Sequence, residues 1–188
     1  EHPIHTFIFP IPHVDITQSG SVSVKAYDYQ GAPVAEDRVE TSGVPADLRL
    51  RAVTGEAGFL ADGVDAAYVD VEVVDKAGHV CLLCDSKIRF LVEGPAEFLG
   101  GYNSGRFRGP DRDDSVIHKD YVYGECGVNR VFLRSGTMPG RITVTASMEG
   151  AQGEQITKTI SLETVQADTG AMTDRMPQRL RGHVMEGG

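Results

Sequence analysis

Residues 61–78 read ADGVDAAYVDVEVVDKAG, and this stretch decides the expected fold class. Val69, Val71 and Val73 share one parity, while Asp70 and Glu72 take the positions between them. Alternation with a period of two is typical of a β-strand that has one face in a core and the other in solvent. We therefore expect a sheet whose valine face is buried, with the two carboxylates on its solvent side.

The same alternation recurs along the rest of the chain. It predicts further strands at residues 48–52, 88–92, 131–133, 142–146 and 156–162, separated by turns rich in Gly and Pro. About seven short strands without helical periodicity favour an all-β fold, an antiparallel β-sandwich of immunoglobulin type. The chain has no Trp, which excludes the Cys-Trp-Cys core of antibody domains.

The first 43 residues predict a separate and incomplete unit. Residues 22–27 and 34–41 alternate around a turn at residues 30–33, and residues 6–9 form a short apolar run. Two or three strands cannot bury a face by themselves. We expect residues 1–43 to be the closing strands of a preceding sandwich, residues 44–165 to form the main sandwich, and residues 166–188 to be a polar, disordered tail.

Composition excludes two classes of partner. The net charge of −9 and the isoelectric point near 5.1 argue against nucleic acid, whose phosphates need clustered Lys and Arg. No apolar run approaches the roughly 20 residues that a membrane-spanning helix requires. We therefore predict neither a nucleic-acid partner nor a membrane span.

A cysteine pair suggests a metal site, which we weigh against simple burial. His79, Cys81, Cys84 and Cys126 would together supply the four ligands of a tetrahedral zinc site. Such sites normally contain a second paired motif, and the sequence has none. Three buried thiols acting as small apolar groups are the simpler interpretation. We predict no metal and no cofactor.

Residues 101–107, GYNSGRF, form the best candidate contact loop. Tyr102, Asn103, Arg106 and Phe107 offer two aromatic faces, an amide and a guanidinium, which suit a sugar or a neighbouring domain. The alternative, which we favour, is that Asn and Gly serve only a tight turn, since both tolerate positive φ. The loop begins a segment, residues 100–127, that is long and rich in Gly, Asp and Arg.

No catalytic motif appears in the chain. A Gly-x-Ser-x-Gly elbow, a His-Glu-x-x-His helix and a phosphate-binding glycine loop are all missing. The 27 acidic residues make chance carboxylate pairs inevitable. We predict that this chain has no catalytic residue and is not an enzyme by itself.

Residues 41–50, TSGVPADLRL, together with the 61–78 stretch resemble the C-terminal region of family 2 glycoside hydrolases, the β-galactosidase-like enzymes of bacteria. The similarity continues at residues 90–94, FLVEG, at residues 98–103, FLGGYN, and at residues 134–150, so that it covers about residues 41–150. Residues 5–41 are similar to the closing strands of the sandwich that precedes this region in those enzymes.

The resemblance implies a β-galactosidase or related exo-glycosidase as the parent protein. Its two catalytic glutamates would lie in an upstream (β/α)₈ barrel, which would be the partner of this chain. The domain would act as a scaffold, with oligosaccharide contacts or homo-oligomer contacts as further roles. A periplasmic, secreted or cell-surface location follows from the resemblance alone.

Two alternatives from other classes stay open. Similar strand signatures occur in bacterial immunoglobulin-like spacers of surface adhesins, although the 61–78 pattern occurs here only once. An autonomous sugar-binding module is the other, and the absence of Trp weakens it.

Overall fold

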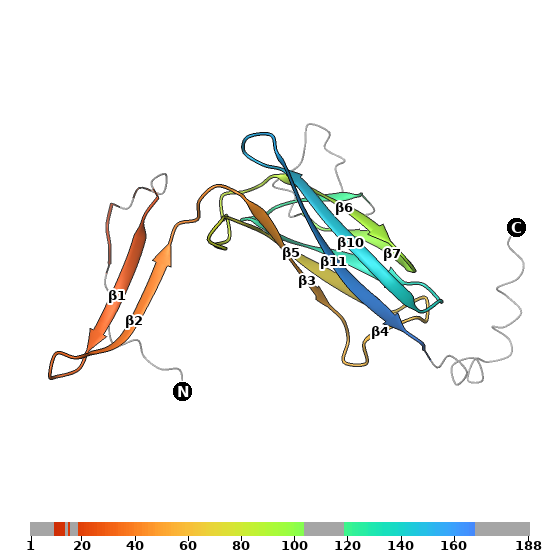
Figure 1. The fold of residues 1–188 in the computed structure, drawn as a ribbon, viewed down its shortest axis with the longest axis horizontal. Coiled ribbons are helices and arrows are strands. Elements are labelled where there is room, and N and C mark those ends of the chain that lie inside the picture. Colours follow the sequence, from red (N-terminus) through yellow and green to blue (C-terminus); the bar gives the residue numbers. More distant parts are fainter. Residues whose placement is uncertain (1–9, 14, 16–18, 104–118, 168–188) are drawn as a thin grey trace, which may run out of the picture.

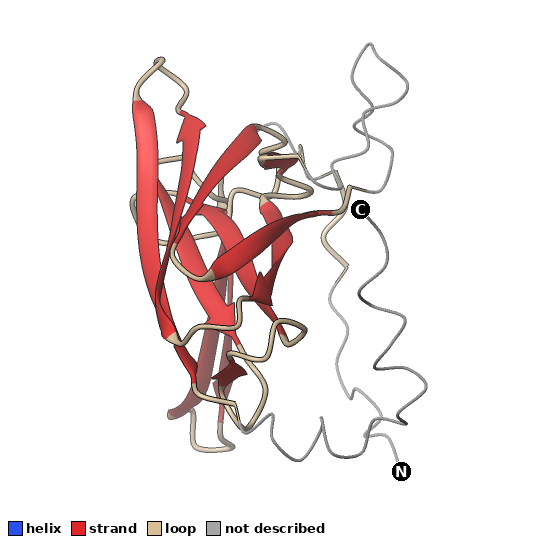
Figure 2. Cartoon of the chain, turned by 90° about the vertical axis from the view of Figure 1, so that its right-hand side faces the viewer, coloured by secondary structure: helices blue, strands red, loops and turns tan. Residues whose placement is uncertain are grey.

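The structure is a computed structural model that describes residues 10–13, 15, 19–103 and 119–167. Within these residues every regular element is a β-strand, and no helix long and apolar enough to cross a membrane occurs among them. Figure 2 shows the described chain as strands and loops only. The all-β fold expected from the sequence is therefore confirmed.

The first two strands form a hairpin that stands beside the rest of the molecule (Figure 1). Strand β1 (Ser21–Tyr27) pairs antiparallel with β2 (Pro33–Glu40), and every residue of the hairpin except Asp28 is exposed. Both strands agree with the predicted ones. Among the described residues, the hairpin therefore buries no hydrophobic core of its own.

The remaining strands form two sheets. The four-stranded sheet has the order β3-β5-β9-β7, and the five-stranded sheet has the order β4-β11-β10-β6-β8. All neighbours are antiparallel except β4 and β11, which are parallel. The strands are β3 (Asp47–Val53), β4 (Phe59–Leu60), β5 (Ala66–Val74), β6 (Lys87–Glu93), β7 (Ala96–Gly101), β8 (Tyr121–Tyr123), β9 (Val128–Ser135), β10 (Gly140–Glu149) and β11 (Gln155–Val165).

One hydrophobic core joins the two sheets in a sandwich-like arrangement. The valines of β5 that the sequence placed on one parity, Val69, Val71 and Val73, are fully buried. They belong to the same apolar cluster as Ile142 and Val144 of β10 in the other sheet. The period-two pattern of each strand thus turns its apolar residues inward, which leaves the alternate residues of the four-stranded sheet on an outer face.

The linker between the hairpin and the sandwich is fastened to the sandwich by one carboxylate. Asp75 accepts hydrogen bonds from the backbone N–H groups of Gly43 at 2.7 Å, Ala77 at 2.8 Å and His79 at 2.9 Å. These bonds, that of Gly43 above all, lower the pKa of the Asp75 carboxyl to about 2. The hinge predicted at residues 42–45 is therefore anchored at its centre.

The structure differs from the sequence prediction between residues 96 and 127. The predicted long loop begins inside β7, and β8 lies within its second half. Strand β7 contains a register shift between Phe98 and Gly100, which breaks the alternation that would have revealed it. The two residues of β4 and three of β8 are too short to show a period.

Candidate functional site

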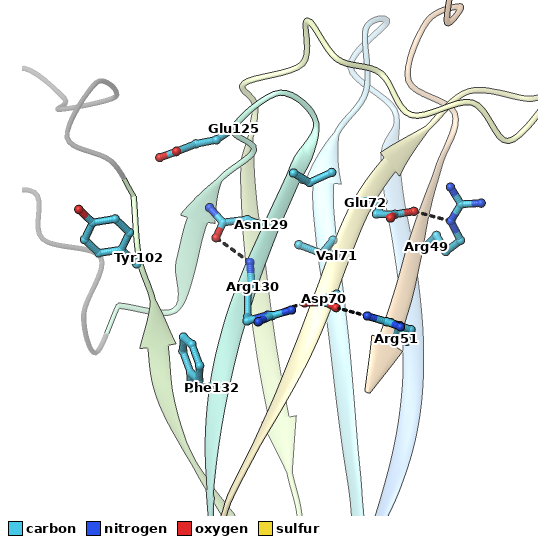
Figure 3. Close-up of a pocket in the computed structure, with 11 residues that line it drawn as sticks. Arg49, Arg51, Asp70, Val71, Glu72, Tyr102, Glu125, Asn129, Arg130 and Phe132 are labelled. Carbon is cyan, nitrogen blue, oxygen red and sulfur yellow. Dashed lines mark hydrogen bonds and ion pairs between the residues drawn. The ribbon is translucent and has the colours of Figure 1, made fainter. Parts of the chain in front are cut away.

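The best candidate site is an open hollow of about 1040 Å³ on the outer face of the four-stranded sheet. In Figure 3, Tyr102 and Phe132 lie on one side of it, Arg49 and Arg51 on the other, and Asp70 with Arg130 between them. The strand period places side chains of β3, β5 and β9 on this face, opposite the core. The lining residues are Arg49, Arg51, Asp70, Val71, Glu72, Tyr102, Glu125, Val128, Asn129, Arg130 and Phe132.

Cross-strand ion pairs cross the floor of the hollow. The Asp70 carboxylate pairs with Arg130 Nε of one neighbouring strand at 2.6 Å and with Arg51 Nη2 of the other at 3.0 Å. Glu72 receives Arg49 Nε at 2.6 Å. The sheet register sets Arg51 and Arg130 directly opposite Asp70, and Arg49 opposite Glu72. Both carboxylates point outward as predicted, but each is paired with at least one arginine.

These contacts decide what the carboxylates can do chemically. The hydrogen bond from Arg130 and then that from Arg51 lower the pKa of Asp70 against the opposing effect of burial. A glycosidase general acid needs the reverse, a carboxyl whose pKa is raised so that it carries a proton near neutral pH. Asp70 is therefore suited to holding arginines in place and unsuited to acid catalysis.

Aromatic rings form the other side of the hollow. The guanidinium of Arg130 lies 3.8 Å from the ring centre of Tyr68, and the Tyr68 and Phe132 rings are 6.4 Å apart. Tyr102 is 68% exposed and Phe132 is 40% exposed, so both rings are open to a partner. A flat, partly apolar surface beside charged groups can bind a sugar ring or a protein surface.

The structure gives different roles to the residues of the predicted contact loop. Tyr102 lines the hollow, whereas the amide of Asn103 is engaged within the protein. Its Nδ2 donates to the carbonyl oxygen of Tyr123 at 3.0 Å and to Glu125 Oε1 at 2.9 Å, and its Oδ1 accepts from the Tyr123 N–H at 3.1 Å. Arg106 and Phe107 lie outside the described residues.

The three cysteines differ in how deeply the structure buries them. Cys81 and Cys84 are buried as expected, but Cys126 is exposed, so the interpretation of three buried thiols is wrong for Cys126. Burial raises the pKa of the Cys81 thiol. His79 Nδ1 lies 3.4 Å from Asp75 Oδ2. No metal-binding group of three or more residues occurs in the part of the chain that the structure describes.

Sequence reasoning missed the ion pairs of the hollow, although the signal was present. Arg49 and Arg51 in one strand, Asp70 and Glu72 in the next, and Arg130 in a third all stand at solvent-facing positions. Opposite charges on strands that become neighbours predict such pairs. Finding them requires knowing which strands are neighbours, and Asp70 and Arg130 are 60 residues apart.

Residues 50–157 match the family described as glycoside hydrolase family 2 C-terminal domain 5. The chain belongs to this family. The resemblance drawn from residues 41–150 is thereby confirmed.

Relatives of this family 2 domain are parts of much larger proteins. A β-glucuronidase of Formosa agariphila is 33% identical over 178 residues, which are 94% of this chain and 17% of that protein. The β-galactosidase BoGH2A of Bacteroides ovatus is 34% identical over 134 residues, 71% of this chain and 15% of that protein. The domain thus spans less than a fifth of each.

A solved structure shows the same relation. The structure of a β-glucuronidase from glycoside hydrolase family 2 is 34% identical and superposes with a TM-score of 0.60, over 80% of this chain and 15% of that one. The family 2 domain is therefore similar to one domain of a larger enzyme, and its relatives carry further domains beside it.

Proposed function

We propose that this chain is a non-catalytic scaffold domain at the C-terminal end of a larger family 2 glycoside hydrolase. The observation that carries the proposal is the match of residues 50–157 to a C-terminal domain of that family. The two arginine partners of Asp70 and its lowered pKa add support, because a carboxyl that stays ionised near neutral pH is unsuited to act as a general acid. The catalytic glutamates would lie in a barrel elsewhere in the longer protein, and that barrel would be the partner of this domain.

The parent enzyme would hydrolyse β-glycosides of oligosaccharides or polysaccharides. Its relatives are a β-glucuronidase and a β-galactosidase, so galactosides and glucuronides are the two substrate classes to test first. We propose a periplasmic, secreted or cell-surface location in a bacterium, and homo-oligomer contacts as a further role.

The finer fold assignment is an immunoglobulin-type sandwich. Support comes from the strand order, since β3-β5-β9-β7 corresponds to the A-B-E-D sheet of that fold and β11-β10-β6 to the G-F-C sheet. Strands β4 and β8 would be additions at the edges. Residues 44–165 would form this domain and residues 1–43 the closing strands of a preceding one. The tail predicted at residues 166–188 lies almost wholly outside the described residues.

The exposed hairpin supports that division of the chain. Val22, Val24 and Val39 are 47%, 54% and 69% exposed, although they occupy one face of a two-stranded sheet. A hairpin of this kind is at best marginally stable in water without a covering layer. Such a layer would be the rest of the preceding sandwich.

Chromogenic glycosides test the proposal. We expect the 188-residue chain to leave nitrophenyl β-galactoside and β-glucuronide intact, and the complete reading frame to hydrolyse at least one of them. Hydrolysis by the 188-residue chain, or a complete frame without a hydrolase barrel, would refute it.

A second candidate function, sugar binding, rests on the exposed rings of Tyr102 and Phe132 beside the ion pairs of the hollow. Calorimetric titration of the chain with galacto- and glucurono-oligosaccharides distinguishes the two. Saturable binding that is lost in Tyr102→Ala would favour the binding module over the pure scaffold.

A further inference from the structure

The cysteine pair and the two residues between it point in opposite directions. Cys81 and Cys84 are only 3% and 9% exposed and belong to the core, whereas Leu82 and Leu83 are 63% and 84% exposed. We name Leu82 and Leu83 the leucine knob. Two adjacent, exposed leucines on one turn form an apolar projection, and such groups are common anchors of protein contacts.

The backbone under the leucine knob is held in place. The Cys81 N–H donates to the Val73 carbonyl at 2.9 Å, and the Cys84 N–H donates to the Cys81 carbonyl at 2.9 Å. The Gly127 N–H donates to the Cys84 carbonyl at 3.0 Å and so ties the turn to the chain preceding β9. A projection on a fixed backbone loses little conformational entropy when it is buried, which favours a specific contact.

The two leucines of the knob line two different hollows near the linker to the hairpin. Leu82 lines a groove of about 520 Å³ that it shares with Val39 of β2, and Leu83 lines a second hollow of about 330 Å³ with Val44 of the linker. Val39 and Val44 are themselves 69% and 64% exposed. Apolar side chains from the hairpin, the linker and the sandwich therefore lie around one bend of the chain, where Arg38, Glu40 and His79 also line the groove.

The hairpin indicates what covers this region. Val39 stands opposite Val22 in the hairpin register, on the face that also carries Val24. A layer that covers this face must extend over Val39, and Val39 also lines the groove that Leu82 lines. The same covering layer would then meet the leucine knob.

We propose that the leucine knob is the contact by which this domain docks on the preceding sandwich of the same protein, the one completed by the hairpin. This rests on the proposed function, in which the domain is part of a longer enzyme. The β-glucuronidase relative matches 94% of this chain with only 17% of its own length, so that protein has ample chain to form such a sandwich. Docking at the leucine knob would fix the angle between the two domains.

Hydrogen exchange in the complete reading frame tests the proposal. The variant is Leu82→Ser with Leu83→Ser, and the matched control is Leu91→Ser, a 58% exposed leucine in β6 away from the linker. We expect residues 21–46 and 79–84 to exchange about tenfold faster in the double variant than in the control. In the 188-residue chain alone, where the covering domain is incomplete, the double variant should exchange as the unaltered chain does.

Two results would overturn the proposal. One is unchanged exchange in the complete protein, since the leucine knob would then meet solvent. The other is a dimer of the 188-residue chain in sedimentation equilibrium that the double substitution abolishes, which would make a second copy the partner. A complete frame without a hydrolase barrel that still shows leucine-dependent protection would refute the proposed function and support the docking contact.

Discussion

Replacing Gly127 by alanine tests how the turn under the leucine knob is packed. Gly127 has a φ of +74°, and a Cβ there would lie 2.4 Å from the carbonyl oxygen of Cys81, a backbone atom that cannot rotate away. The residue also makes two backbone hydrogen bonds, from its N–H to Cys84 and from the Val73 N–H to its carbonyl. Gly78 offers a control, since its φ is +89° and nothing lies within 4 Å of its Cβ position.

The expected losses differ because only one of the two positions is crowded. A left-handed backbone costs an alanine about 1–2 kcal/mol, and this is the full cost at Gly78. At Gly127 the two segments must also separate, which weakens two hydrogen bonds worth about 1 kcal/mol each. We therefore expect the free energy of unfolding to fall by about 3–4 kcal/mol in Gly127→Ala.

Thermal unfolding followed by circular dichroism measures the difference. For a domain of this size, 1 kcal/mol corresponds to about 3–5 °C in Tm, so Gly127→Ala should melt about 9–20 °C lower and Gly78→Ala about 3–10 °C lower. Equal losses in the two variants would refute the close approach of the two segments. They would also remove the rigid base on which the leucine knob is placed.

Three further predictions concern the linker, the hollow and the contact loop. The Asp75 pKa lies at about 2 against an ordinary 3.8, so its stabilising effect is present above about pH 4 and is lost as the pH falls toward 2. Unfolding curves between pH 2 and 6 should therefore be flatter for Asp75→Asn than for the unaltered chain, and parallel curves would contradict this. Asp70→Asn should lower the free energy of unfolding by at most about 1 kcal/mol, and less in 1 M NaCl, because its arginine partners are largely exposed; a loss of several kcal/mol that salt does not reduce would contradict surface ion pairing. Asn103→Ala should cost about 1–3 kcal/mol through its lost bonds to Tyr123, as measured by urea unfolding, whereas Tyr102→Ala should cost nearly nothing. Equal effects at these two neighbours would show that Asn103 does not brace β8.

The sequence predicts the long strands of this fold because each carries its own period. Val69, Val71 and Val73 reveal β5 without reference to any other strand, and Ile142 and Val144 do the same for β10. Strand β7 could not be found in this way, since its register shift and two glycines interrupt the pattern. The limit is physical, because a local period survives only where the strand is long and regular.

The candidate site depends on contacts that a local pattern does not contain. Composition singles out Tyr102, but its place in the hollow that Arg130 and Phe132 also line follows from the pairing of β7 with β9. For Asn103 the sequence offers a contact role or a tight turn with positive φ; Asn103 is not among the non-glycine residues with positive φ, and its amide instead bonds to the backbone of Tyr123. Arg106 and Phe107 lie beyond the described residues, so their contribution to the site stays a prediction.

The turn at residues 81–84 has buried ends and an exposed middle, and this has a consequence for how such domains can change. The side chains at positions 81 and 84 pack in the interior, while those at positions 82 and 83 contact only what lies outside the domain. A mutation in the middle pair therefore carries almost no folding penalty, and one in the flanking pair alters no surface chemistry. Selection can act on attachment and on stability separately here, so a lineage could remodel how its domains are joined through two neighbouring codons.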